Sequence, residues 1–552
     1  MSLIKVKYKN EEKEYEKGIL ISEIAKEYKD DYKYDILVSM IDNRVTSLDT
    51  KLNKDCTISF CDISSHSGYV SYEKGIFFLF SVAAREILNC DVKFLHSLDN
   101  GIYGQILTNN LISEVTIEKI KMKMRDLAND ALPITKIMVS RIDAIEYYNK
   151  INQIDKAKSL RYISNSSISL YKLSDTLDFF YGVLPNNTSL LNKFNVKFLK
   201  DNKFVLMIPD KTNYDNFENV KLIKNEKLLN SLEKNDKYLE SLKIDTSVEL
   251  NKMISSGNYG DLIRVSEAIK NNELFDIADK ISKEKDLKVV LITGPSSSGK
   301  TTTARKLTLF LKSKGLNPIP ISVDDFYVDV KNRVLDENGE PEKEKIDAID
   351  TNLFNKKISE LLNKKEVHMP KYNFITGEKE YSEKITKMED NSVLVIEGIH
   401  AFNEQLTEMI PDKNKFKIFI CPLTPLNIDN HNIFKSSDNR LLRRIVRDNM
   451  TRGASAKTTL KLWQNVRKEE DENIIPYMKD ADVIFNTSLN YELGVLKTYA
   501  EPLLFSVLED DPNYDEAIRL INLFRVILSM PSENVPFDSI IREFIGGSCF
   551  KD

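Results

Sequence analysis

Cysteine is scarce in this chain of 552 residues and follows no pattern. An odd number of scattered cysteines without a C-x-x-C pair is typical of buried or incidental thiols, and it argues against a disulfide framework or a thiolate metal site. The five are Cys56, Cys61, Cys90, Cys421 and Cys549. We therefore expect a protein of a reducing compartment, the cytoplasm.

Long apolar runs are also missing. The longest, from Gly75 to Ala84, is about half the length that a transmembrane helix needs. The first ten residues alternate lysine with apolar residues and have no signal-peptide core. We expect no membrane segment.

No charge of one sign dominates, because 79 basic residues face 84 acidic ones and the net charge is −5. This balance does not predict an electrostatic nucleic-acid binder, although a local basic patch stays open. A hydrophobic content of 41% is enough to form the hydrophobic cores of folded domains. The length indicates three or four domains.

One stretch carries a clear chemical pattern. The apolar run Leu287 to Ile292 reads as a buried strand, and Gly294 to Thr301 then fits G-x-x-x-x-G-K-[ST]. Ala304, Leu307 and Leu311 follow at helical spacing. The pattern predicts a strand, a phosphate-binding loop and a helix that begins at Lys300.

The chemistry of such a loop needs these residue types. Glycine lets the backbone approach an anion, and the backbone N–H groups at a helix N-terminus point at phosphates. The Lys300 ammonium reaches the terminal phosphates and the Thr301 hydroxyl can sit on magnesium. We predict ATP and Mg²⁺ as cofactors, and we expect Lys300 on an exposed loop. The predicted nucleotide-binding residues are Gly294, Pro295, Ser296, Ser297, Ser298, Gly299, Lys300, Thr301 and Thr302.

Carboxylates follow two further apolar runs. The run from Ile319 ends at Asp324 and Asp325, and the run Val393 to Ile396 ends at Glu397. Because the carboxyl ends of parallel strands face the ligand crevice, we expect these carboxylates near the loop. In an extended chain Asp325 would point away from Asp324, so we rank it lower. A strand-end cap or a turn residue is the alternative for Asp324.

Five segments in fixed order resemble the uridine kinase and phosphoribulokinase family. They are Ser322–Tyr327 (S-x-D-x-F-Y), Met369–Phe374 (P-x-Y-x-F), Val393–Ile399, Arg444–Gly453 (R-x-x-R-D-x-x-x-R-G) and Ala481–Asn486. The resemblance implies a kinase with a P-loop NTPase parallel sheet and helices on both faces.

The resemblance also implies roles. The expected catalytic residues are Asp324 as the base, Lys300, Arg447 and Arg452; the expected acceptor-binding residues are Tyr327, Tyr372, Phe374 and Arg444; the expected magnesium ligands are Thr301 and Glu397. A solvated basic face is the alternative for the arginines, and core packing for the aromatics. Uridine kinases carry a base-contacting histidine where this chain has Gly377, so the identity of the acceptor stays open.

The N-terminal half resembles threonyl-tRNA synthetase. Residues 1–62 read as a β-grasp domain of the TGS type, a docking module or an RNA- or ligand-binding one. Residues 63–200 resemble the α+β editing domain, with helices at Tyr72–Leu88 and Val115–Asn129 and a turn at Gly101–Gly104. The H-x-x-x-H of that domain is replaced by Ser81 and Arg85, so we expect no editing. We expect His66 and His96 to be structural.

The remaining boundaries are a connector at 201–285, the kinase domain at 286–500 and a helical tail at 501–552. The ending Arg542–Ser548 resembles the tail of a bacterial fusion family that joins these two halves. We assign it no chemistry and expect it to dock on the surface.

These patterns predict an ATP-dependent kinase of a small sugar-containing acceptor, and we favour the 5′-hydroxyl of a nucleoside. The rival hypothesis is an ATP-gated binding protein that acts on RNA or the ribosome through its N-terminal half. The sequence leaves open the acceptor, the regulator and whether the chain forms a homo-oligomer.

Overall fold

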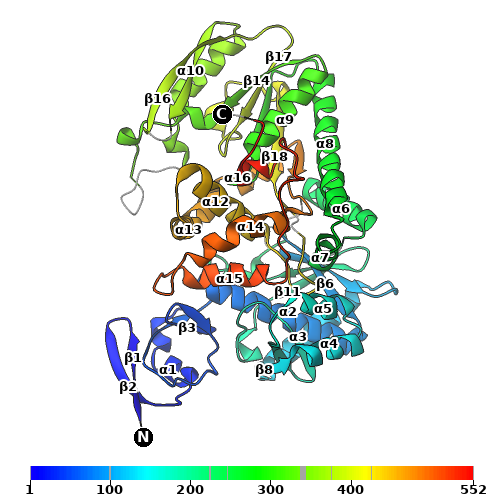
Figure 1. The fold of residues 1–552 in the computed structure, drawn as a ribbon, viewed down its shortest axis with the longest axis vertical. Coiled ribbons are helices and arrows are strands. Elements are labelled where there is room, and N and C mark those ends of the chain that lie inside the picture. The colour runs from blue at the N-terminus through cyan, green and yellow to red at the C-terminus, as the bar shows by residue number, and fades with distance from the viewer. Residues whose placement is uncertain are drawn as a thin grey trace.

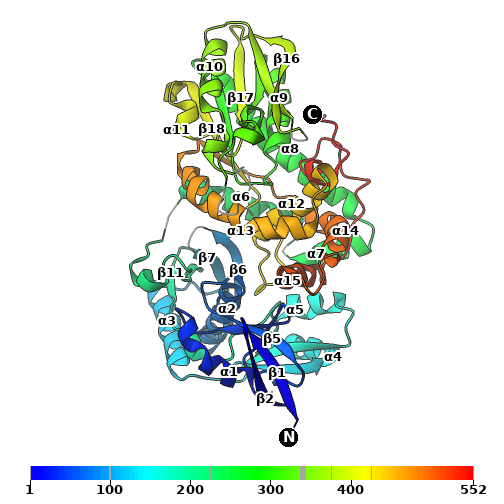
Figure 2. The same ribbon diagram turned by 90° about the vertical axis from the view of Figure 1, so that its left-hand side faces the viewer.

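The structure, a computed structural model, describes residues 2–98, 101–222, 225–244, 246–335, 344–373, 376–423 and 426–550. The N-terminal units lie at one end and the sheet that carries the phosphate loop lies at the other, with helices between them (Figures 1 and 2). Among the described residues, no helix combines the length and apolar content that crossing a bilayer requires.

The first unit is a five-stranded mixed sheet with strand order β2-β1-β5-β3-β4. Alternate residues of β1, namely Ile4, Val6 and Tyr8, are buried in a core with Ile21 and Ile24 of α1. This is the β-grasp arrangement that the alternating pattern predicts. The elements are β1 (Leu3–Tyr8), β2 (Glu11–Glu16), α1 (Ile21–Glu27), β3 (Val38–Ile41), β4 (Arg44–Thr46) and β5 (Cys56–Cys61).

The second unit packs two helices on a sheet of order β11-β12-β7-β6, beside a smaller sheet, β10-β9-β8. Since β12 belongs to the larger sheet, this unit continues past residue 200. The elements are α2 (His66–Leu88), β6 (Asp91–Leu98), β7 (Gly101–Leu107), α3 (Glu114–Asn129), β8 (Thr135–Ser140), α4 (Arg141–Lys150), α5 (Ile154–Ser159), β9 (Ser167–Leu173), β10 (Thr176–Asp178), β11 (Asn195–Phe198) and β12 (Lys203–Met207).

Two details of this unit differ from the prediction. The helix expected from Tyr72 begins at His66, where the Ser65 hydroxyl accepts a hydrogen bond from the Gly68 N–H at 3.1 Å. The turn expected at Gly101–Gly104 is wrong, because both glycines lie inside β7. A Cβ at Gly104 would stand 2.3 Å from the ring of Phe204, its partner on β12. Glycine there makes room for a neighbouring strand's side chain.

The connector forms three helices: α6 (Glu226–Leu242), α7 (Ser247–Ser255) and α8 (Tyr259–Lys283). The sequence predicts helices at Val248–Ile254 and Leu262–Ile269: the first nearly matches α7, whereas α8 is longer at both ends. Leu274 and Ile277 of α8 share a buried core with Leu307 and Leu311 of the phosphate-loop helix. The connector is therefore part of the kinase core.

The sheet of the kinase half has the order β14-β17-β13-β18-β19, and all neighbouring strands are parallel. In β13, Val290 and Ile292 pack on one side in the core that contains α9, whereas Val289 and Leu291 pack on the other in the core that contains α10. The predicted fold class, with helices on both faces, is confirmed (Figure 1). Pro318 and Pro320 stand in β14, an edge strand, where a missing N–H is tolerated.

The elements of this half are β13 (Val289–Thr293), α9 (Lys300–Ser313), β14 (Asn317–Ser322), α10 (Thr351–Leu362), β15 (Val367–Asn373), β16 (Glu378–Thr386), β17 (Ser392–Glu397), α11 (Glu404–Thr407), β18 (Lys415–Cys421), α12 (Ser436–Arg452), α13 (Ala456–Asn473), β19 (Val483–Asn486), α14 (Glu492–Phe505), α15 (Tyr514–Phe524) and α16 (Arg542–Ile545). Helix α14 runs across residue 500. The prediction of a strand through Asp325 is wrong, since β14 ends at Ser322 and residues Val323–Phe326 form a 3₁₀ turn.

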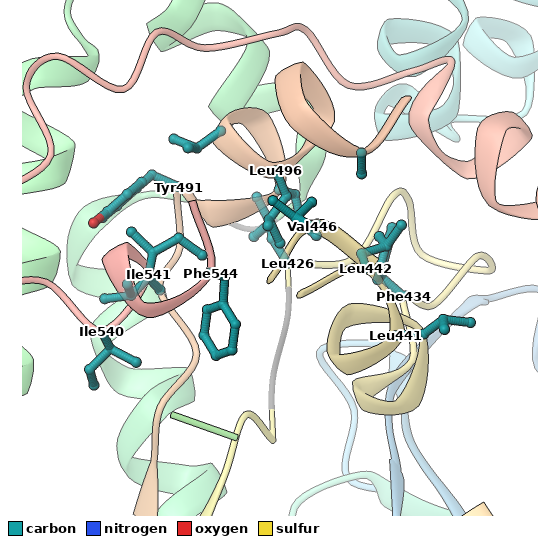
Figure 3. Packing of buried hydrophobic residues seen from close by; sticks show 14 of the residues in the cluster. Leu426, Phe434, Leu441, Leu442, Val446, Tyr491, Leu496, Ile540, Ile541 and Phe544 are labelled. Atoms are coloured by element: carbon teal, nitrogen blue, oxygen red, sulfur yellow. The ribbon is translucent and has the colours of Figure 1, made fainter. Parts of the chain in front are cut away.

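The C-terminal tail does not dock on the surface as expected. Ile541 and Phe544 have no exposed surface. They lie in one core with Leu442 and Val446 of α12 (Figure 3). The tail therefore forms part of the hydrophobic core of the kinase half.

Candidate active site

The phosphate loop between β13 and α9 is shaped by contacts that side chains would break. Gly294 has φ +156°, and a Cβ there would stand 1.9 Å from the carbonyl oxygen of Ile420 on β18. Ser297 adopts φ +58°, a left-handed conformation that serine rarely takes. Within the described part of the chain, the buried hydroxyls of Ser297 and Ser298 have no hydrogen-bond partner. A cradle of this kind fits phosphate oxygens.

Lys300 folds back over the loop. Its Nζ donates to the carbonyl oxygens of Gly294 and Pro295, both at 3.0 Å. Burial lowers the pKa of Lys300, and the nearby carboxylate of Glu397 works against that shift. The expectation of an exposed loop is wrong: Ser297 and Ser298 are buried, because α12, α13 and the tail cover the loop.

The two predicted magnesium ligands meet at the strand ends. The Thr301 hydroxyl donates to Glu397 Oε1 at 3.2 Å, and the Ser322 hydroxyl donates to the same oxygen at 3.1 Å. Burial raises the pKa of Glu397 to about 7, the charge of Asp324 adds to this, and Lys300 opposes it. No group of three His, Cys, Asp or Glu side chains in the described ranges could hold a metal ion alone. One carboxylate and one hydroxyl suit Mg²⁺, which keeps waters and takes phosphate oxygens as further ligands.

Asp324 and Asp325 have different surroundings. Asp324 lies in the 3₁₀ turn after β14, and no described residue hydrogen-bonds to its carboxylate. Its charge reaches Glu397 and Lys300, since it contributes to the pKa shift of each. Asp325 Oδ1 instead accepts from the Tyr372 N–H at 3.2 Å and so holds β15. Of the two carboxylates, only that of Asp324 accepts no hydrogen bond from a described residue.

Three arginines of α12 converge on one carboxylate. Arg444, Arg447 and Arg452 form ion pairs with Asp448, at 3.2, 2.8 and 3.5 Å. Arg444 Nη1 also donates to the Ser296 hydroxyl at 3.0 Å, so it contacts the phosphate loop. A cluster of guanidinium groups beside such a loop is suited to binding phosphate oxygens.

Two other arginines of α12 hold the loop. Arg440 pairs with Glu470 at 2.6 Å and donates to the Ser296 carbonyl at 3.2 Å. Arg443 pairs with Glu492 at 2.5 Å and donates to the Ser297 carbonyl of the loop at 3.5 Å. Both side chains are buried, so they support the loop and do not form a solvated basic face.

Two of the three predicted aromatic residues lie together, and an arginine side chain joins them. The rings of Tyr327 and Tyr372 lie 5.5 Å apart, and the Arg333 guanidinium carbon lies 4.4 Å and 5.1 Å from their centres. Arg333 Nη2 donates to the Tyr372 hydroxyl at 2.6 Å. A Cβ at Gly377 would be 2.6 Å from Val330 Cγ2, so Val330 fills the space beside that glycine. Phe374 lies outside the described residues.

Sequence reasoning missed four residues of this region. They are Arg333, His400, Glu470 and Glu543. His400 Nε2 contacts the Glu344 carbonyl oxygen at 2.7 Å, and burial lowers the pKa of its imidazole. Its position three residues after Glu397 is a signal that could have found it. Glu470 lies in a charged run without a motif, and only the fold brings it to the loop.

In the second unit, Ser81 and Arg85 stand where the predicted resemblance expects histidines. The Ser81 hydroxyl donates to the Phe77 carbonyl at 2.8 Å, and Arg85 pairs with Asp91 at 3.5 Å. His431 of the kinase half is buried between Asp91 and Asp178, at 3.0 and 2.6 Å. His66 and His96 each pair with a carboxylate, Glu516 and Asp236.

Comparison with known proteins agrees with this geometry. Residues 289–492 match the sequence profile described as the Phosphoribulokinase / Uridine kinase family. A uridine kinase of Mycoplasma genitalium is 31% identical over 225 residues, which are 40% of this chain and 96% of that kinase. The chain belongs to this family. The predicted resemblance is confirmed, and membership places the chain among kinases of nucleosides and sugars.

The N-terminal half has relatives of another kind. A threonine–tRNA ligase of Francisella tularensis is 23% identical over 185 residues, which are 33% of this chain and only 29% of the ligase. The predicted fusion of two halves is thereby confirmed. Among solved structures, one described as a possible uridine kinase from Bacillus stearothermophilus has 19% identity and a TM-score of 0.26, and the match covers 39% of this chain and 99% of that one.

Proposed function

We propose that this protein is an ATP- and Mg²⁺-dependent kinase that phosphorylates a hydroxyl of a small sugar-containing acceptor, with a nucleoside 5′-hydroxyl as the favoured group. One observation carries the proposal. The phosphate loop, the Thr301–Glu397 pair and the unbonded carboxylate of Asp324 lie together at the carboxyl ends of β13, β17 and β14. Family membership and the uridine kinases among the relatives support it.

We assign each of these residues a separate role in the reaction. Bound ATP supplies the γ-phosphoryl group, and Mg²⁺ neutralises part of its charge. Lys300 and the loop N–H groups would hold the phosphates, and Thr301 and Glu397 would hold the ion. Asp324 takes the proton of the acceptor hydroxyl, whose oxygen then forms the new bond to phosphorus as the bond to ADP breaks. Arg447 and Arg452 stabilise the charge on the transferring group, with Arg444 on the donor side.

Nucleoside-dependent release of ADP tests the proposal. The full chain is incubated with ATP, Mg²⁺ and one nucleoside at a time, and the phosphorylated product is identified by mass spectrometry. We expect ADP release that depends on a nucleoside and that Lys300→Ala abolishes without unfolding the protein. Turnover by Lys300→Ala at saturating ATP would refute the assignment of the loop.

A second candidate is an ATP-gated binding protein for RNA. One observation favours it: the N-terminal half is linked to the base of α12 by Lys435 and Glu73, whose charged groups lie 2.6 Å apart. In that case tRNA affinity would change with ATP, and no small acceptor would stimulate ADP release. The same samples, with tRNA added in place of nucleosides, distinguish the two candidates.

A further inference from the structure

A carboxylate from the C-terminal tail accepts a hydrogen bond from a backbone N–H at the start of α9, a group suited to binding phosphate. Glu543 Oε2 accepts a hydrogen bond from the backbone N–H of Thr302 at 3.0 Å. Thr302 lies in the first turn of α9, which begins at Lys300. Backbone N–H groups in a first turn have no partner within the helix and attract anions. The Glu543 carboxylate therefore stands where a phosphate oxygen of a bound nucleotide would stand.

Packing places Glu543 there. On one side, Ile540 lies close to the loop: a Cβ at Gly299 would be 2.5 Å from Cγ2 of Ile540. On the other side, the ring centre of Phe544 lies 5.0 Å from the guanidinium carbon of Arg443. Figure 3 shows Ile540, Ile541 and Phe544 in the core beside Tyr491. Apolar neighbours thus hold a charged side chain on the loop.

The rest of the tail is anchored independently of Glu543. The Ser539 hydroxyl donates to Glu267 Oε1 at 2.5 Å, and Asp538 pairs with Lys306 at 3.1 Å. Arg542 Nη2 donates to the carbonyl oxygens of Ser532 and Val535 at 2.7 and 2.8 Å. The Glu543 side chain can therefore rotate away from Thr302 while the backbone of the tail stays in place.

We propose that the tail is an internal competitor for the donor site, in which the Glu543 carboxylate must leave the Thr302 N–H before a nucleotide can bind fully. This inference rests on the proposed function, because it takes the loop as the nucleotide site. The competitor remains at a fixed high local concentration. It weakens nucleotide binding until phosphate oxygens displace it, and it keeps the loop ordered when no nucleotide is bound.

The affinity of the full-length protein for ADP tests the proposal. Glu543→Gln keeps the shape and removes the charge, and Glu543→Asp keeps the charge on a side chain too short to reach Thr302. We expect both variants to bind ADP roughly tenfold more tightly than the wild type in titration calorimetry, a factor that corresponds to about 1.4 kcal/mol. Glu533→Gln, an exposed change ten residues earlier in the same tail, is the matched control and should leave the ADP affinity unchanged.

Three outcomes are possible for folded variants. Tighter binding by both Glu543 variants and not by Glu533→Gln supports the competitor. Equal or weaker binding by the Glu543 variants, with ADP still bound by the wild type, overturns the competitor and leaves the proposed function intact. Absence of ADP binding by every variant and the wild type overturns both. If Glu543→Gln melts early, Glu543→Asp alone decides.

Discussion

At the scale of single residues, Arg333 packs against the two tyrosines that we propose for acceptor binding, although it lies in no recognised motif. Asp324 and Glu397 follow apolar strands within recognisable segments, so their positions can be predicted from sequence. Arg333 lies in no such segment. Its loop is tied to the turn before β16, where the Val330 N–H donates to the Gly377 carbonyl at 2.9 Å. Glu543 is 241 residues from its partner Thr302, which local reasoning cannot foresee.

Arg333→Met tests the acceptor site. The methionine keeps apolar bulk beside the two tyrosines and removes the guanidinium, which we propose contributes hydrogen bonds to the acceptor site. Hydrogen bonds to charged groups contribute about 1.5–3 kcal/mol, so kcat/KM for the acceptor should fall roughly 10- to 100-fold while ATP affinity stays unchanged. Lys331→Met, at an exposed lysine two residues away, is the control. An unchanged kcat/KM would show that Arg333 only fills space.

Acceptor choice is a second prediction at this scale. A site that hydrogen-bonds a substrate group rejects analogues that lack the group. Since Gly377 offers no side chain and Val330 fills the space beside it, we expect broader selectivity than that of a uridine kinase, or a shift away from pyrimidines. Values of kcat/KM for uridine, adenosine, guanosine and inosine measure this. A thousandfold preference for uridine would contradict it, unless Arg333→Met abolishes that preference.

At the scale of elements, the periodicity of apolar residues predicts the bounds of amphipathic helices well. It predicts poorly a segment whose structure depends on contacts with a distant part of the chain. Helix α3 begins one residue before the predicted Val115 and ends at the predicted Asn129. Gly101 and Gly104 are turn signals by composition, yet they lie in a strand because Val205 and Phe204 of β12 need their space. Glycine in a strand often marks such a close approach.

Helix α2 carries a lysine whose charge is costly. Burial lowers the pKa of Lys74 to about 7, and the positive charges of Arg519 and Lys435 lower it further, against Glu73 and Asp438. An unfolded lysine has a pKa near 10.4. Between pH 7 and pH 10 the unfolded state therefore binds more protons at Lys74 than the folded state does. The free energy of unfolding should rise with pH over this range.

Lys74→Met should remove that dependence. We expect the variant to melt at a higher temperature than the wild type at pH 7, and the difference to shrink by pH 10. Melting curves across this range measure it, with Lys119→Met at an exposed lysine of α3 as the control. A loss of stability at every pH would show that Lys74 is needed as a charged group.

At the scale of the whole molecule, the second unit contacts the other half at the residue before α12, where Glu73 pairs with Lys435, and at α15. Arg519 of α15 donates to both oxygens of Asp438 at the start of α12, at 2.9 and 2.7 Å, and it also pairs with Glu516, which contacts His66 of the second unit. The likeness of each half to a known family can be predicted from sequence. The ion pairs between the two halves cannot, because they depend on docking between distant segments.

The second unit should lack the hydrolytic activity of an editing domain. Ser81 and Arg85 replace the histidines, and their side chains already have partners within the unit. We expect the full chain to release no amino acid from a mischarged aminoacyl-tRNA above the rate of spontaneous hydrolysis. Faster release that survives Lys300→Ala would show that another set of residues performs this reaction.

The central claim is that Asp324 is the base of a phosphoryl transfer, and Asp324→Asn tests it most directly. The change keeps the shape of the side chain and removes its basicity, while the residues that hold ATP are left intact. One variant is measured for ATP affinity, melting temperature and kcat. We predict that ATP affinity and melting temperature hardly change and that kcat falls roughly 10²- to 10⁴-fold. An unchanged kcat would remove Asp324 from the chemistry and contradict the account.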